Sequence, residues 1–598
     1  MRGEAFELFT TAHGHTGIHI TETGLDYLEK YHEGMGQGMV QRPPLELICK
    51  RQNTKGHEMK TTLATTAALV LALTAQAEFK VDRTAMSEKY WSIWNDEVQA
   101  KIDADIEKYR KTDASVEVAA PDGAEVKVEQ ITHAFFFGAH IFNFDQLGKK
   151  EWNDRYKALY GQENGLFNSA TVAFYWRTLE QYPNAPRFAA GYEDSEEYWC
   201  REYAIDPEGC KAKPHWRRPA VDPVISFLKT RRVRIHGHPL VWGNNAWHTP
   251  TWLWDDFCPE SEKRALEAAT GVKMPVRDVT RPICVKDMGP NSAWRGWQRA
   301  WAEIYAKLSE EEIAALVPTF VKAQRDFYEK RVREIGERYG TRVDSWDVVN
   351  ESATDWAHGK GAKNDLPVTK SHYGLMPANY AYEALVLARK YMRPGAWLNV
   401  NEYNMDAFPG QIADLERNGA TFDVVGSQMH LFNPAESRKL AAGEFTAETR
   451  QKVSPEGIAT TMEKVAKASG GRPIHLSEIT ITAPDNSPKG QMVQAIIMRN
   501  CYRAWFAVEK MNGITWWNVV DNCGAPGEPS ISGIFTRDMQ PKAAYFAMDD
   551  LINREWKTKT TVKAEGGKVS FRGFRGRYRL TWKDASGKKQ SKLVDVAD

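Results

Sequence analysis

The sequence predicts an α/β fold: a (β/α)8 barrel with long βα-loop insertions and a small β appendage at its C-terminal end. The first observation is that short β-like runs alternate with longer helical runs over residues 131–555. The second is that no glycine-rich phosphate loop follows the first run, whereas the competing doubly wound sheet would need one. The third is that short strand-like runs, split by Gly566-Gly567 and Ser586-Gly587, follow Trp556.

The strand-like runs come first. They lie at 135–138, 234–237, 345–349, 397–400, 424–426, 474–476 and 514–517. One long helix is expected from Glu311 to Tyr339, because its apolar residues fall on one stripe. Two stretches rich in Pro, Trp, Cys and charge, 183–222 and 253–300, are interpreted as long βα loops at the face where barrel active sites form. The appendage, 556–598, is near the lower size limit for independent folding, so we expect it to pack on the barrel.

The N-terminal region resembles a secretory signal placed inside the chain. A basic start at Met59, a short apolar run and an Ala-Gln-Ala ending describe a signal peptide over 59–77. The apolar run is too short to span a bilayer. Residues 1–58 show no sustained helical or strand period, so we interpret them as upstream sequence read in frame. Residues 78–130 form a lead-in to the barrel, and the mature protein is expected to begin near Glu78, outside the cytoplasm (periplasmic or extracellular).

Composition narrows the class of function. The 598 residues carry a net charge of +1, which gives no indication of a nucleic-acid or membrane partner. The 21 Trp, 22 Tyr and 24 Phe are consistent either with a large core or with flat faces that stack on sugar rings. No Cys-x-x-Cys pair occurs, so a zinc site has little support. Six cysteines after the signal allow disulfides in an exported chain: Cys200, Cys210, Cys258, Cys284, Cys501 and Cys523.

Two predicted strands end in a carboxylate, and this pair carries the chemical argument. Trp-Asp-Val-Val-Asn leads into Glu351, and Pro-Ile-His-Leu-Ser leads into Glu478. On a barrel the two side chains can face each other across the mouth, three strands apart. Cleavage of a glycosidic bond uses such a pair, one as proton donor and the other as nucleophile. A single strand-end glutamate more often caps a helix or pairs with an arginine, but the pair together favours catalysis.

These motifs resemble the family 10 glycoside hydrolases, chiefly endo-1,4-β-xylanases, over roughly residues 130–550. The resemblance implies that Glu351 is the general acid/base, Glu478 the nucleophile and Asn350 a ligand of the sugar 2-hydroxyl. Further motifs in the same order add His-Gly-His-Pro-Leu-Val-Trp, Asn-Glu-Tyr-Asn, Gly-Ser-Gln-Met-His and Thr-Trp-Trp-Asn. They imply substrate contacts by His238, Trp242, Tyr403, Gln428, His430 and Trp517. The implied substrate is a xylan-type polysaccharide or oligosaccharide, and no metal or organic cofactor is needed.

The sequence departs from the family pattern at the outer sugar subsite. A Glu-Asn pair and a Lys are replaced by Thr171, Val172 and Tyr175, so stacking on an aromatic surface is expected to replace polar contacts. The motif arginine is His236, and the aspartate two residues after the nucleophile is Thr480, which is expected to weaken support for the motif histidine. Two alternatives stay open: a related barrel glycosidase acting on glucan or mannan, and a glycan-binding barrel without turnover.

Overall fold

The computed structural model describes residues 6–10, 16–20, 79–161, 163, 165–208, 218–243, 248–275, 293–357, 379–525 and 528–597. The chain divides into two compact units, Met1–Ala75 and Gln76–Asp598. In the first unit, β1 (Phe6–Thr10) and β2 (Thr16–Ile20) pair as an antiparallel hairpin, where the sequence pattern predicted no element. The predicted signal peptide, 59–77, lies outside the described residues.

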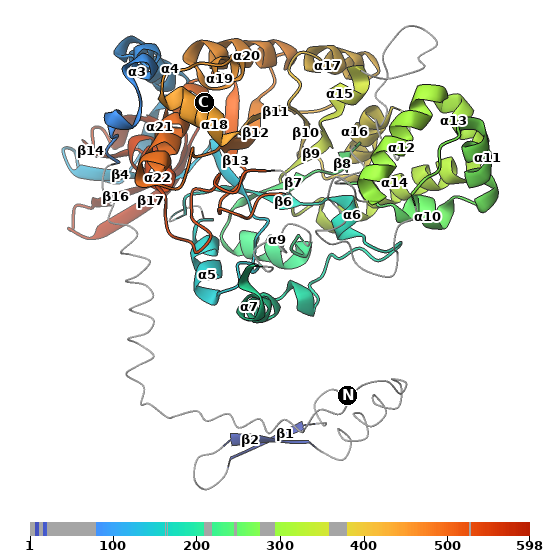
Figure 1. The fold of residues 1–598 in the computed structure, drawn as a ribbon. Coiled ribbons are helices and arrows are strands. Elements are labelled where there is room, and N and C mark those ends of the chain that lie inside the picture. Colours follow the sequence, from blue (N-terminus) through green and yellow to red (C-terminus); the bar gives the residue numbers. More distant parts are fainter. Residues whose placement is uncertain are drawn as a thin grey trace. The chain divides into compact units, whose positions relative to one another are not determined.

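The second unit is built around a closed barrel of parallel strands, which confirms the predicted (β/α)8 fold (Figure 1). Each strand pairs with the next, and the last pairs with the first. In chain order the barrel strands are β5 (Phe136–His140), β6 (Ser169–Ala173), β7 (Arg234–His238) with its continuation β8 (Val241–Trp242), β9 (Ser345–Asn350), β10 (Trp397–Glu402), β11 (Val424–Leu431), β12 (Ile474–Ile481) and β13 (Met511–Trp516).

One barrel strand, β6, is absent from the runs that the sequence pattern indicated. Its residues, Ser-Ala-Thr-Val-Ala, are small and are buried at every position. A strand that is covered on both faces shows no alternation, and this one also contains no aromatic residue, Ile or Leu. Burial at every position of β12 has the same cause.

One long helix follows each barrel strand in the described part of the chain and covers the barrel from outside (Figure 1). These are α5 (Lys150–Ala158), α9 (Val221–Thr230), α14 (Pro318–Tyr339), α16 (Tyr380–Tyr391), α17 (Phe408–Arg417), α20 (Pro455–Ala468), α21 (Pro488–Phe506) and α22 (Ala543–Asp549), which runs into η5 (Asp550–Glu555). None of the helices that the structure describes is long and apolar enough to cross a membrane.

The single helix predicted from Glu311 to Tyr339 is wrong, because the structure has two. α13 (Glu310–Leu316) begins with a capping box, in which Ser309 and Glu312 exchange side-chain to backbone hydrogen bonds. Val317 leaves the helical conformation with φ −128° and ψ 53°, and α14 starts at Pro318. Proline disfavours a helical residue before it but suits the first helical position, so it splits a continuous apolar stripe into two helices.

The two predicted loop insertions do follow barrel strands, but they contain helices. The first carries η2 (Tyr192–Asp194) and α7 (Glu196–Ile205), and α6 (Trp176–Leu179) lies just ahead of it. The second carries α10 (Trp252–Phe257), α11 (Glu260–Thr270) and α12 (Ala293–Lys307) ahead of α13. Shorter helices complete the other connections and the N-terminal segment: η1 (Arg83–Ala85), α3 (Glu88–Ile93), α4 (Asp96–Arg110), α15 (Ser352–Ala357), α18 (Pro434–Ala441) and α19 (Ala447–Val453).

The C-terminal appendage shares its sheets with the lead-in segment. Its strands are β14 (Lys559–Lys563), β15 (Lys568–Phe574), β16 (Gly576–Lys583) and β17 (Lys589–Val596). They pair with β3 (Lys111–Glu117) and β4 (Glu125–His133) in the orders β14-β4-β16-β17 and β15-β3. The two sheets enclose one hydrophobic core, so both ends of the 79–597 segment build a single β module that neither end can form alone.

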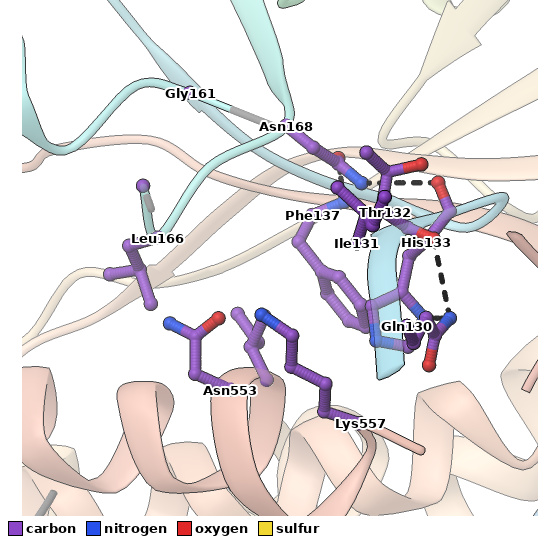
Figure 2. A pocket seen from close by; sticks show the side chains of 12 residues that line it. Gln130, Ile131, Thr132, His133, Phe137, Gly161, Leu166, Asn168, Asn553 and Lys557 are labelled. Carbon is purple, nitrogen blue, oxygen red and sulfur yellow. Dashed lines mark hydrogen bonds between the residues drawn. The ribbon is translucent and has the colours of Figure 1, made fainter. Parts of the chain in front are cut away.

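The β module packs on the barrel near the start of β5. The Trp556 ring stacks on Phe506 with centroids 4.1 Å apart, and the Arg110 guanidinium donates to the Met511 carbonyl at 2.7 Å. A cavity of about 20 Å³ lies between β4, β5 and η5, with His133 and Lys557 in its lining (Figure 2). Its volume is about that of one water molecule.

Four of the six cysteines that follow residue 77 lie in the described residues, and none of these four forms a disulfide. Cys258, Cys501 and Cys523 are buried, and Cys200 is half-buried. Burial raises the pKa of the Cys258 thiol to about 12, which makes it an unreactive core residue. Cys210 and Cys284 lie outside the described residues.

Candidate active site

The structure gathers the predicted site residues at the C-terminal ends of the barrel strands. Glu351 directly follows β9, Glu478 lies on β12, and the two strands are separated by β10 and β11, as the sequence predicted. The other predicted residues lie at the ends of, or just after, their strands. They are Tyr175 (β6), His238 (β7), Trp242 (β8), Asn350 (β9), Tyr403 (β10), Gln428 and His430 (β11), and Trp517 (β13).

Glu351 has an unusual backbone conformation. Its φ is +54°, in the left-handed region that side chains other than glycine seldom adopt, and its N–H donates to the Asn401 carbonyl at 2.8 Å. The chain therefore turns sharply where β9 ends, and one backbone hydrogen bond to β10 holds the turn. Such strained residues often occur at functional sites, where surrounding contacts fix them.

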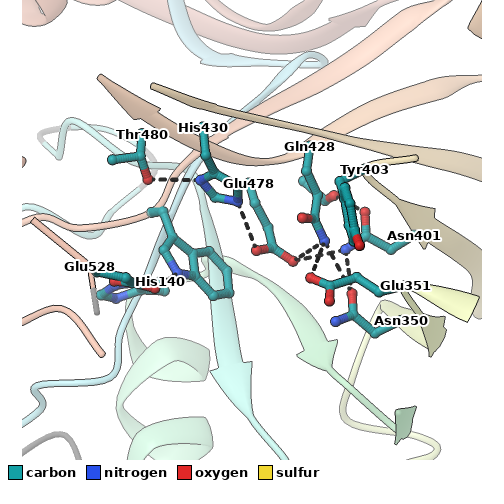
Figure 3. A network of polar contacts seen from close by, with 12 residues as sticks. His140, Asn350, Glu351, Asn401, Tyr403, Gln428, His430, Glu478, Thr480 and Glu528 are labelled. Atoms are coloured by element: carbon teal, nitrogen blue, oxygen red, sulfur yellow. Dashed lines mark hydrogen bonds and ion pairs between the residues drawn. The ribbon is translucent and has the colours of Figure 1, made fainter. Parts of the chain in front are cut away.

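Glu478 lies in a network of side-chain amides (Figure 3). The Asn401 amide donates to its Oε1 at 2.8 Å, and the Gln428 amide donates to the same oxygen at 2.9 Å. Asn401 also donates to the Asn350 side-chain carbonyl at 2.8 Å. Gly426 allows this arrangement, because a Cβ on Gly426 would lie 2.9 Å from the Asn401 Cα. Hydrogen bonds from the Asn401 and Gln428 amides favour the ionised form of Glu478 and orient its carboxylate.

One nitrogen links the two candidate catalytic carboxyl groups. Gln428 Nε2 lies 2.9 Å from Glu478 Oε1 and 3.2 Å from Glu351 Oε1. The two oxygens are therefore at most about 6 Å apart, which fits the roughly 5–5.5 Å of retaining glycosidases better than the roughly 6.5–9.5 Å of inverting ones.

Burial and mutual repulsion set the titration of this pair. Burial raises the pKa of Glu351 well above the usual range of a glutamate, and the charges of Glu478 and Glu402 raise it further. Burial also raises the pKa of Glu478, but His238 and the amide of Asn401 oppose that effect. Glu478 thus receives more groups that favour its charged form than Glu351 does.

His238 is held by a buried aspartate on the neighbouring strand. Its Nδ1 lies 2.8 Å from Asp347 Oδ2, and its Nε2 lies 3.7 Å from Glu478 Oε1. His236, which replaces the expected arginine, places Nε2 2.9 Å from the same aspartate oxygen and Nδ1 2.8 Å from Ser345. Burial alone would raise the pKa of Asp347, but the two imidazoles lower it below its ordinary value. Asp347 therefore orients His238 toward Glu478.

His430 contacts Glu478 from the other side. Its Nε2 lies 3.4 Å from Glu478 Oε2, and its Nδ1 lies 3.0 Å from the Thr480 hydroxyl. Burial lowers the pKa of His430 to about 4, so this imidazole is neutral at neutral pH. A threonine thus supports the histidine where an aspartate was expected, and it orients the ring without adding a negative charge beside Glu478.

Trp517 forms one wall of the site together with Phe142 and His238. Its ring meets each of the two side chains edge-on, at centroid distances of 5.4 and 5.2 Å. The Trp517 Nε1 donates to Glu528 at 3.2 Å, and Glu528 also accepts from the Asn518 amide at 2.8 Å. The carboxylate of Glu528 therefore fixes the orientation of the indole.

The aromatic run after β6 is mostly structural. Phe174 and Trp176 are fully buried, with Phe174 against Trp346 and the Trp176 indole donating to Glu180. Only Tyr175 is partly exposed, and its ring lies 5.6 Å from the ring of His238. Thr171 and Val172 are also buried. The expected stacking surface at the outer subsite thus reduces to Tyr175.

The remaining predicted residues lie at the rim of the mouth. Trp242 is half-buried with its ring 6.1 Å from that of Tyr175. Tyr403 is 52% exposed and accepts a hydrogen bond from the Thr354 hydroxyl at 3.4 Å. Both present aromatic surface that a sugar ring can contact.

Sequence reasoning did not assign several residues that complete the site. Asn401 is the first residue of the Asn-Glu-Tyr-Asn motif, so the same motif could have identified it as a site residue. Asp347 also lies in such a motif, two residues after the start of β9. By contrast, Glu528 lies in a loop after β13 with no surrounding pattern, and only the fold brings it to Trp517. Within the described residues, no three His, Cys, Asp or Glu side chains are arranged to hold a metal ion.

A closed parallel barrel with a pair of glutamates at its mouth is the arrangement found in barrel glycosidases. Comparison with known proteins then supplies the family. Residues 289–551 match the model of Glycosyl hydrolase family 10, the family that the motifs resemble. The match covers the part of the chain that carries Glu351, Gln428 and Glu478.

Curated relatives are distant. Endo-1,4-beta-xylanase A of Halalkalibacterium halodurans is 23% identical over 237 residues, which cover 38% of this chain and 46% of that protein. Endo-1,4-beta-xylanase B of Thermotoga neapolitana is 24% identical over 242 residues, which cover 38% and 62%. The chain spans about half the length of the curated relatives it matches. Among solved structures, xylanase B from Clostridium stercorarium F9 has a TM-score of 0.42 at 17% identity, covering 71% of this chain and 99% of that one.

Proposed function

We propose that the chain is a retaining, endo-acting glycoside hydrolase that cleaves β-1,4-xylosidic bonds by double displacement, with Glu351 as general acid/base and Glu478 as nucleophile. The observation that carries this proposal is the bridge from Gln428 Nε2 to both carboxyl groups, which limits their separation to about 6 Å. A sugar-binding protein has no use for a buried carboxylate pair at that separation, because keeping two such groups together in a dry site is unfavourable.

The first step needs the two glutamates in opposite protonation states. The pair loses its first proton at Glu478, because His238 favours the charged form of this group. The remaining proton stays on Glu351, whose pKa is raised by burial and by the charges of Glu478 and Glu402. The Glu478 carboxylate then attacks the anomeric carbon while Glu351 donates its proton to the leaving oxygen. A glycosyl ester forms on Glu478, and the aglycone sugar leaves with the proton.

The second step reverses these roles. Once Glu478 is esterified it carries no charge, so its repulsion no longer raises the pKa of Glu351. Glu351, now a carboxylate, takes a proton from water, and the oxygen of that water attacks the anomeric carbon. The ester breaks, Glu478 leaves as a carboxylate, and the sugar keeps its original anomeric configuration.

The surrounding residues bind and orient the sugar at the nucleophile. His238, His430 and Asn350 offer polar groups beside Glu478, and Trp517 offers an aromatic wall. Xylan as the backbone rests on the names of the relatives, which are endo-1,4-beta-xylanases. We also propose export by the segment 59–77, on its composition alone.

The test is release of reducing ends from xylan, glucan and mannan side by side, with the anomeric configuration of the first product followed by NMR. The proposal expects xylan to be cut fastest and the product to keep the β configuration. Faster cleavage of glucan or mannan would reassign the backbone, an inverted product would reassign the mechanism, and binding without cleavage of any of the three would leave a glycan-binding barrel. Glu478→Gln is the matched inactive control.

A further inference from the structure

One half-buried arginine at the barrel mouth has a buried guanidinium nitrogen without a partner among the described residues. Arg218 lies just before α9, and its guanidinium carbon is 4.5 Å from the Phe142 ring centroid and 5.8 Å from that of Tyr175. Its Nη1 is buried and donates no hydrogen bond to a described residue. Among the described residues, no carboxylate lies within 4 Å of this guanidinium. The neutralising role usually played by an aspartate or glutamate is therefore unfilled.

The contrast with a neighbouring buried arginine is direct. Arg331 contacts the same strand region, yet its guanidinium donates to the carbonyls of Leu240 and Phe174. Arg331 is thus a structural residue whose donors the backbone satisfies. Arg218 has five such donors in a planar fork, and its buried Nη1 has no hydrogen-bond partner among the described residues.

The position of Arg218 connects it to the reacting centre. The Tyr175 ring lies between the guanidinium and the His238 ring, at 5.8 and 5.6 Å, and His238 Nε2 lies 3.7 Å from Glu478. Phe142, over which the guanidinium stacks, meets Trp517 edge-on at 5.4 Å. Arg218 is therefore on the side of the mouth formed by Tyr175, Phe142 and Trp517, beside the carboxylate that attacks the glycone sugar in the proposed function.

We infer that Arg218 binds a carboxylate carried by the glycone part of the substrate, so that the preferred substrate is a glycan bearing a uronic acid near the cleavage point. A guanidinium fork matches a carboxylate in two parallel N–H···O bonds. The rings of Phe142 and Tyr175 lie 4.5 and 5.8 Å from the guanidinium carbon and restrict the orientation of the fork. This inference rests on the proposed function and names the substrate class of that site.

Desolvation of the guanidinium favours binding of an acidic sugar and disfavours binding of a neutral one. Desolvation lowers the pKa of Arg218, and Tyr175 and Glu528 only partly oppose this. A carboxylate ligand compensates the buried charge, whereas a neutral sugar leaves it unpaired. Thr171, Val172 and Tyr175 stand where the family pattern has a Glu-Asn pair and a Lys. The subsite nevertheless keeps a charged group, because Arg218 from a different loop supplies one.

The experiment compares glucuronate-bearing xylo-oligosaccharides with the same oligosaccharides after reduction of the carboxyl group to an alcohol. Binding is measured by calorimetry with the inactive Glu478→Gln protein, so that it does not depend on turnover. We expect the acidic form to bind at least roughly tenfold more tightly than the reduced form. The Arg218→Gln change in that background should remove the difference by weakening only the acidic ligand, and Arg218→Lys should retain part of it.

Two controls keep the test decisive. Arg234→Gln removes another arginine stacked on a ring, Phe136, at the opposite end of β7, and it should leave the preference unchanged. If Arg218→Gln does not fold, the inference is still tested by comparing the acidic and reduced ligands on the Glu478→Gln protein that keeps Arg218. Equal binding of both ligands, or equal loss on both after Arg218→Gln, would overturn the inference.

Turnover by the active protein separates this inference from the proposed function. The carboxylate should appear on the product fragment that carries the new reducing end, because that fragment is the glycone. A carboxylate found only on the other fragment would overturn the placement of Arg218 in the glycone subsite. No cleavage of either oligosaccharide, with the binding preference intact, would overturn the hydrolase proposal and leave Arg218 as a carboxylate-binding residue.

Discussion

Gln428 offers the sharpest single perturbation of the site. Its buried amide donates to Glu478 at 2.9 Å and to Glu351 at 3.2 Å, so Gln428→Ala removes one donor from each carboxyl group. A hydrogen bond to a charged group contributes about 1.5–3 kcal/mol, and about 1.4 kcal/mol corresponds to one pKa unit. Because the donor favours the charged form of both groups, its loss raises both pKa values. We expect both limbs of the pH profile of kcat/KM to move to higher pH, by about one to two units for Glu478.

The same change should lower the maximum of kcat/KM by about 10- to 100-fold, since the carboxyl pair also loses its bridge. The assay is initial rate against pH on a soluble xylo-oligosaccharide. Gln494→Ala is the matched control: that buried amide donates to the Ile481 and Gly533 carbonyls and does not contact the pair, so stability falls but the limbs stay in place. A pH profile of Gln428→Ala that keeps its limbs would refute the reasoning.

Three further predictions concern other parts of the molecule. Glu351→Ala should slow cleavage of aryl glycosides with acidic phenols far less than cleavage of oligosaccharides, because only a sugar leaving group needs a proton; equal losses would remove Glu351 from the acid role. Tyr175→Ala should weaken both plain and branched xylo-oligosaccharides by stacking loss and should weaken acidic ones further by freeing Arg218; an equal, small change on all would make Tyr175 structural. N-terminal sequencing of protein from its native host should begin close to Glu78, and a start at Met1 would contradict the export proposal.

The sequence predicted the barrel because its strands repeat a strong signal. Runs such as 345–349 combine β-branched and aromatic residues with a polar residue at the end, and helices with one apolar stripe separate them. β6 escaped this reasoning because its small residues carry no period. Pro318 indicated the start of a new helix, but the apolar stripe continues on both sides of it and favoured a single helix.

The β module could not be predicted as one body from local pattern. Its strands at 559–563 and 568–574 were expected, but their partners lie more than 400 residues earlier, at 125–133 and 111–117. Periodicity reports which face of a strand is buried but not which strand covers it. Pairing between the two ends of a domain is fixed by the closure of the barrel between them.

The site shows the same division. Glu351, Gln428 and Glu478 stand in motifs whose order the sequence displays, so their convergence followed from the barrel. Glu528 and Arg218 lie in loops without a pattern, and only their distances to Trp517, Phe142 and Tyr175 give them a role. The loss of charged residues at Thr171, Val172 and Tyr175 therefore gave no indication that Arg218 would supply a charge from another loop.

The most direct test of the central claim is chemical rescue of Glu478→Ala. Without the carboxylate no glycosyl ester forms, so cleavage of an aryl xylobioside should fall by at least roughly a thousandfold while the protein stays folded. Added azide should restore cleavage by occupying the vacated space, and the glycosyl azide should have the inverted configuration. A variant that keeps more than about a thousandth of the original rate without azide, or that yields a product of retained configuration with it, would contradict the assignment of Glu478 as nucleophile.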